Sequence, residues 1–191
     1  LGDALRPGNE RIWDIVLTRR LTGGGAMLYG VATDDAHDYH EFAARHRNPG
    51  RGWIMVRSSI LAADSLMEAM ERGEFYASTG VTLSELRREG QRLTLEIRGD
   101  PGVRYTTQFI GTRRGYDTAS VAMHDSAGAP VTRRYSVDVG TVLSEVRGTT
   151  ATYTMRGDEI YVRARIASTK YKANPSYDGE TEMAWTQPMQ P

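Results

Sequence analysis

The spacing of apolar residues predicts alternating helices and strands over the first part of the chain. Apolar residues at helical spacing follow a Pro-Gly-Asn breaker and predict a helix from about residue 9 to a stop before Gly23. A second helix is expected to begin at Asp64 or Ser65 and to end at Gly73. Such alternation is typical of α/β proteins. Short apolar runs predict the intervening strands at residues 26–33, 52–58 and 75–79.

The pattern changes at Gly80, after which apolar and polar residues mostly alternate with a period of two. About seven strands over about 110 residues are typical of a β-sandwich. We therefore predict two domains, an α/β piece at residues 1–80 and an all-β accessory domain at residues 81–191. The expected strands are residues 93–97, 103–110, 134–139, 150–155 and 160–167, with weaker candidates at 119–123 and 183–187.

Composition narrows the classes of partner. The chain of 191 residues carries 24 basic and 24 acidic side chains. It therefore has no net positive charge that would attract nucleic acid or an anionic membrane. Without cysteine, a metal must be held by oxygen and imidazole. No apolar run approaches the roughly 20 residues of a spanning helix, and residues 1–4 are not a signal peptide. We expect a soluble fragment whose upstream region, including any targeting segment, has been removed, and the compartment stays open.

The stretch "ATDDAHDYH" concentrates three carboxylates and two imidazoles between Asp34 and His40. It does not fit a calcium loop, because Tyr39 occupies the position of the required glycine. It does not fit a zincin helix either, because Ala44 stands where the second histidine belongs. The two simplest metal motifs are therefore excluded.

If the apolar strand continues through this stretch, Asp35 and His37 project from the same face. A carboxylate beside an imidazole suits zinc, manganese or iron. A solvated loop and a metal-free acid/base pair remain alternatives. Around the pair, Asp34 and His40 are candidates for supporting contacts, and Arg57 is a candidate phosphate contact. No residue is assigned a catalytic role.

The run "YGVATDDAHDYH", followed by "GRGWIMVRSSILAADSLMEAMERGEFYASTGV", resembles the C-terminal part of a PHP (polymerase and histidinol phosphatase) domain. The resemblance covers roughly residues 9–80, and in similar proteins a β-rich tail follows. Asp35 and His37 match the last ligand motif of that family. The resemblance implies the fold class α+β: a C-terminal fragment of a distorted (β/α)7 barrel joined to an all-β sandwich.

The resemblance further implies phosphate ester hydrolysis at a multi-metal site that holds divalent zinc, manganese or iron and takes a phosphorylated substrate. The family also needs an early His-x-His motif, which this chain lacks. We therefore expect the isolated chain to bind metal poorly, or not at all, and to catalyse little. The other ligands would come from the missing N-terminal barrel portion, and that portion or another copy of the chain would cover the exposed edges. The alternative is a non-catalytic binding or scaffolding β-sandwich module that carries a degenerate barrel remnant.

Overall fold

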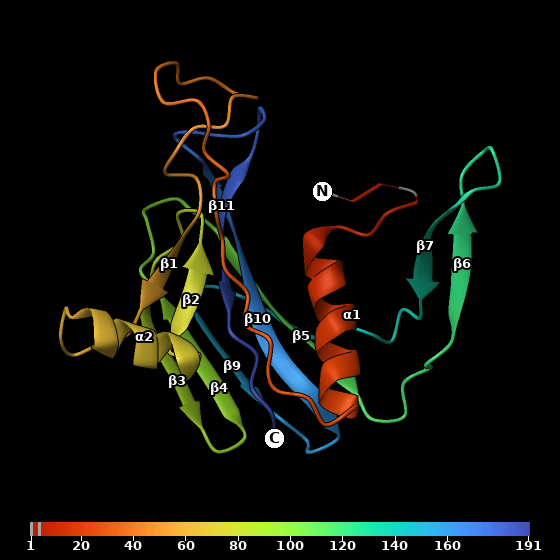
Figure 1. Cartoon of the computed structure of the whole chain (residues 1–191). Helices are drawn as coiled ribbons and strands as arrows, with labels where there is room; N and C mark the ends of the chain where they lie inside the picture. Colours follow the sequence, from red (N-terminus) through yellow and green to blue (C-terminus); the bar gives the residue numbers. More distant parts are fainter. Residues whose placement is uncertain (1, 4) are drawn as a thin grey trace.

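Two helices and eleven strands form the part of the chain that the computed structural model describes, residues 2–3 and 5–191 (Figure 1). Helix α1 (Asn9–Thr22) and helix α2 (Ala63–Glu71) both confirm the sequence prediction. The turn after α2 uses Gly73, whose φ of 70° lies in the left-handed region. Neither helix is long and apolar enough to cross a membrane.

The strands form three antiparallel sheets. In the largest sheet the strand order is β1-β2-β11-β10-β5-β8, the second is β3-β4-β9, and the third is the hairpin β6-β7, which projects beyond α1 in Figure 1. The largest sheet takes strands from both sides of residue 80. The bounds are β1 (Trp53–Val56), β2 (Phe75–Ser78), β3 (Leu83–Glu89), β4 (Arg92–Ile97), β5 (Tyr105–Arg113), β6 (Ser120–His124), β7 (Pro130–Tyr135), β8 (Thr141–Arg147), β9 (Thr150–Thr154), β10 (Glu159–Tyr171) and β11 (Thr181–Thr186).

The main core lies between the six-stranded and the three-stranded sheet. Alternation along β4 buries Leu93, Leu95 and Ile97, because successive side chains of a strand point to opposite faces. They belong to one apolar cluster with Phe109 of β5 and Val162 of β10. Phe109 has no exposed surface. This cluster is the main source of hydrophobic stabilisation.

Helix α1 packs against β10 through an apolar contact and a buried ion pair. Leu17 of α1 and Tyr161 of β10 are fully buried where the helix packs on the strand. Beside them, the carboxylate of Asp14 accepts hydrogen bonds from Nε and Nη2 of Arg163, both at 2.8 Å, and from the Tyr161 hydroxyl at 2.7 Å. Burial and the neighbouring Asp14 carboxylate raise the pKa of Tyr161. The Arg163 guanidinium also lies 4.7 Å from the ring centre of Trp13.

The predicted fold class is wrong, because the chain is mostly β and its sheets are open and antiparallel. A (β/α)7 barrel needs parallel strands joined by crossover helices. Here Val56 at the end of β1 pairs with Phe75 at the start of β2, so the chain returns antiparallel after α2. In addition, the apolar run at residues 26–33 is extended but belongs to no sheet. No fragment of a barrel is therefore present in the described residues.

Candidate functional site

The segment at residues 26–33 lies across the molecule between α1 and β1 and leads into the charged stretch. Its backbone makes no hydrogen bond to another backbone group of the described residues. Side chains fasten it instead: the Trp13 indole donates to the Leu28 carbonyl at 2.9 Å, and the Gln187 amide exchanges two hydrogen bonds with Gly30, at 2.7 and 2.8 Å. The Tyr29 ring packs edge-on against Phe75 at 5.9 Å.

The charged stretch presents Asp35 and His37 together on its exposed side. Exposed and partly buried residues alternate from Val31 to Asp38, so both side chains face solvent, with 77% and 60% of their surfaces exposed. Oδ1 of Asp35 lies 3.9 Å from Nδ1 of His37. The backbone is not a regular strand here, because φ of Asp35 is +49°. Aspartate tolerates this left-handed conformation better than most residues.

A backbone contact fixes the protonation pattern of the imidazole. Nδ1 of His37 lies 2.6 Å from the carbonyl oxygen of Asp35. A carbonyl oxygen only accepts hydrogen bonds, so Nδ1 carries the proton and donates it. In the neutral ring Nε2 then keeps its free lone pair, the arrangement that metal-binding histidines commonly show. Nε2 is separated from Nδ1 by Cε1, so its lone pair points away from the Asp35 carbonyl oxygen.

A buried polar network holds the loop that follows. The side chain of Asn48 is fully buried and donates to the carbonyls of Asp38, at 2.9 Å, and Glu41, at 2.7 Å. Its Oδ1 accepts from Nη2 of Arg51 at 3.0 Å. Arg51 is itself buried and also donates to the His46 carbonyl. Side-chain hydrogen bonds therefore hold this loop, which contains no helix or strand.

The same network ties the loop to a segment more than 120 residues away. Nε and Nη2 of Arg51 donate to Oδ1 of Asn174, at 3.2 and 3.0 Å. Lys172 donates from Nζ to the Arg51 carbonyl at 3.1 Å and pairs with Glu180 at the same distance. In Figure 1 this segment lies beside the loop, above β11. Sequence reasoning missed Asn48, Arg51 and Asn174, and only their occurrence near Pro and Gly turns could have suggested a structural role.

The three remaining predicted residues, Asp34, His40 and Arg57, make no contact in the described part of the chain that supports the Asp35–His37 pair directly. Oδ2 of Asp34 accepts a hydrogen bond from the Gly50 amide at 2.5 Å, so it closes the base of the loop. His40 is exposed, and its ring has no hydrogen bond among the described residues. Arg57 donates to the Leu86 carbonyl at 2.6 Å and pairs with Glu85 at 3.3 Å. Its guanidinium thus contacts β3 and not the Asp35–His37 pair.

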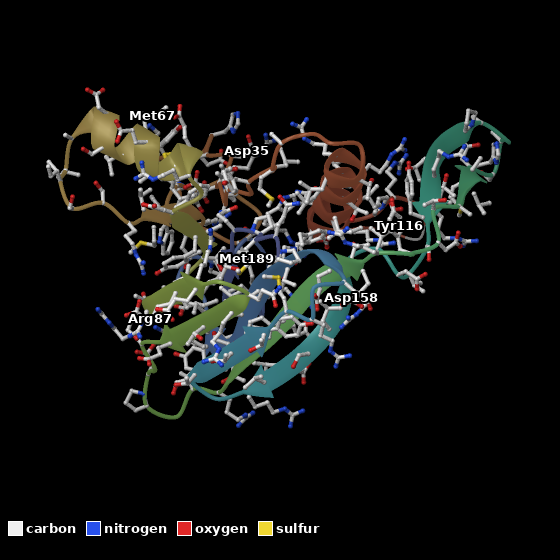
Figure 2. The ribbon with its side chains drawn as sticks, turned by 90° about the horizontal axis from the view of Figure 1, so that it is seen from below. Asp35, Met67, Arg87, Tyr116, Asp158 and Met189 are labelled. Carbon is white, nitrogen blue, oxygen red and sulfur yellow. The ribbon has the colours of Figure 1, made fainter. Side chains whose placement is uncertain are left out.

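Within residues 2–3 and 5–191, no group of three or more histidine, aspartate and glutamate side chains could hold a metal ion. Asp35 and His37 therefore offer two ligand atoms without a third of these types. Figure 2 places Asp35 on the side of the molecule that carries both helices, whereas Asp158 lies on the side of the sheets.

Fold and site together define an antiparallel β protein with an exposed carboxylate–imidazole pair beside a hydrogen-bonded loop. No protein-family model, no curated protein and no solved structure matches this chain. The likeness to PHP domains consequently remains a prediction from the residues of the charged stretch and the run that follows it.

Proposed function

We propose that this chain is the C-terminal part of a metal-dependent phosphoesterase and that Asp35 and His37 are two ligands of its divalent-metal site. The observation that carries the proposal is the geometry of the pair: both side chains are exposed on the same side of the chain, and Nδ1 of His37 donates its proton to a carbonyl oxygen. Nε2 of His37 and the carboxylate of Asp35 are left free as ligand atoms.

The ligand atoms of Asp35 and His37 make up part of a divalent-metal site. One carboxylate and one neutral imidazole suit zinc, manganese or iron. We infer that further ligands come from a preceding part of the polypeptide or from another copy of the chain. Large exposed apolar side chains nearby suggest that another polypeptide segment covers this region. Val31, Tyr39 and Phe42 are 57%, 60% and 62% exposed.

Divalent cations bound there would supply Lewis acidity toward a phosphoryl oxygen and a more acidic bound water. The contribution of this chain is positional. The Asn48–Arg51 network holds the loop, and the carbonyl of Asp35 orients the imidazole. The substrate class is a phosphate ester, and the similarity of Asp35 and His37 to the PHP ligand motif supports it.

A binding module without catalysis is the second candidate function. It is favoured by the lack of a third histidine or carboxylate ligand beside the pair in the described part of the chain. The two candidates differ in what they require of His37, because only the enzyme needs its Nε2 lone pair.

Replacing His37 with alanine is expected to weaken Zn²⁺ or Mn²⁺ binding at least about tenfold, because one of two available ligands is removed. Isothermal titration of the parent chain and of His37→Ala, at cation concentrations high enough to detect weak binding, measures this change. His124→Ala is the matched control, because His124 is also exposed but lies on β6 of the separate hairpin. The control is expected to bind as the parent does.

Equal affinity in the parent and in His37→Ala would remove His37 from the ligand set and would favour the binding module. In the proposed enzyme, extended to include its preceding residues, His37→Ala should also lower metal-dependent hydrolysis of phenyl phosphate about 100-fold or more. Unchanged hydrolysis would contradict the proposed role.

A further inference from the structure

A cleft of about 520 Å³ lies between β3 and the strands β1 and β2, and the turn that follows α2 completes its lining. This volume falls within the usual range of small-molecule sites. None of the lining residues belongs to the loop that carries Asp35 and His37. The cleft is therefore separate from the proposed metal ligands. Its apolar walls include Met55, Val56, Phe75, Leu83 and Leu86.

The charged side chains of the cleft leave one cation without a counter-ion. Three arginines and two glutamates line it. Arg57 pairs with Glu85 at 3.3 Å, and Arg72 pairs with Glu74 at 3.0 Å. The third arginine, Arg88 of β3, forms no ion pair with any of the described residues. Its positive charge is thus not compensated locally.

Arg88 also has unused hydrogen-bonding capacity. A guanidinium carries five N–H donors, and among the described residues the one acceptor that Arg88 contacts is the carbonyl oxygen of Gln187, at 3.2 Å. The side chain is partly buried, and this burial lowers the pKa of Arg88 from its usual value. Tyr29 and Glu74 face Arg88 with an opposing attraction, and Arg57 adds repulsion. A bound anion would relieve both the repulsion and the unpaired donors.

We propose that this cleft binds a small ligand through its oxyanion, a phosphate or a carboxylate, and that Arg88 is the main anion-binding residue. Arg57 lies near enough to share the charge, and the apolar walls receive a hydrocarbon part of the ligand. Arginine is suited to this role, because its planar fork matches the geometry of an oxyanion. The site goes beyond the proposed phosphoesterase and does not depend on it.

Titration calorimetry of the whole chain with phenyl phosphate and with phenylacetate tests the proposal, with EDTA present to remove metal. We expect saturable binding of at least one of these anions, and the stronger of the two identifies the preferred headgroup. Arg88→Gln should weaken that binding at least about tenfold, since charge-assisted hydrogen bonds are lost.

Arg87→Gln is the matched control. Arg87 is the neighbouring residue on the opposite face of β3, with a side chain 56% exposed, and Figure 2 shows it at the outer edge of the molecule. Its replacement should change the affinity less than about twofold. A circular dichroism spectrum matching the parent shows whether Arg88→Gln is folded. If it is not, Arg57→Gln provides the second test and should weaken binding severalfold.

The cleft site would be overturned by no saturable binding by the parent chain, by equal loss in Arg88→Gln and Arg87→Gln, or by unchanged affinity in both Arg88→Gln and Arg57→Gln. Binding should persist in His37→Ala. Loss of anion binding in His37→Ala would move the anion to the Asp35–His37 loop and overturn the cleft while leaving the proposed phosphoesterase intact.

Discussion

Asp14→Ala is expected to lower the free energy of unfolding by about 3–5 kcal/mol, the range measured when one partner of a buried ion pair is removed. Arg163 is 1% exposed, and Asp14 accepts two of its N–H groups and the Tyr161 hydroxyl. Without the carboxylate, a buried cation keeps only Glu10, at 3.3 Å and partly exposed. Urea denaturation followed by tryptophan fluorescence and circular dichroism measures the change.

The double variant Asp14→Leu/Arg163→Met separates the charge from the packing. Replacing both partners by apolar side chains of similar size removes the uncompensated charge, so the double variant should recover most of the stability lost in Asp14→Ala. A loss below about 1 kcal/mol in Asp14→Ala would contradict the account of how α1 is held on β10. So would a double variant that is less stable than the single one.

Phe109→Ala is expected to cost about 3–5 kcal/mol, because it leaves a cavity where the two main sheets meet. Phe109 is fully buried on β5 and stacks on the ring of Tyr153 from β9, with ring centres 5.3 Å apart. Denaturant unfolding of Val121→Ala is the control. Val121 lies on the projecting hairpin and is 58% exposed, so its loss should cost less than about 0.5 kcal/mol. Equal effects of the two substitutions would contradict the assignment of the core.

The sequence predicted local elements better than their arrangement. Both helices and most strands of the β-rich part lie near their predicted ranges, because helical stripes and two-residue alternation directly reflect burial. The predicted strand at 134–139 overlaps only the end of β7. Strands β3 and β8 were missed. Both are edge strands that carry charged residues on their exposed side, which weakens the alternating pattern.

The error in fold class arose from the apolar run at residues 26–33. A continuous apolar run is typical of a buried parallel strand, but apolar side chains can also be buried without a hydrogen-bonded ladder. Here Tyr29 packs on Phe75, and Gly30 approaches the Trp13 ring so closely that an added Cβ would lie 2.9 Å from it. Side-chain contacts with distant residues therefore account for part of the run, and sequence spacing carries no information about them.

The candidate site was accessible to sequence reasoning only in part. The two-residue spacing of Asp35 and His37 predicted that they project to one side, although the backbone reaches this arrangement through a left-handed residue. The supporting contacts were not predictable. Arg51 and Asn174 are 123 residues apart, and nothing in the composition of either turn indicates that they meet.

The protonation state of His37 tests the central claim most directly. Long-range ¹H–¹⁵N spectra of the imidazole rings, assigned with His37→Ala, report which nitrogen carries the proton and which responds to added Zn²⁺. We expect the Nδ1–H form in metal-free protein and a large shift of the Nε2 resonance, with Nδ1 still protonated, on addition of Zn²⁺. An Nε2–H form, or ring resonances that do not change with Zn²⁺ in the chain extended to include its preceding residues, would contradict the assignment of His37 as a metal ligand.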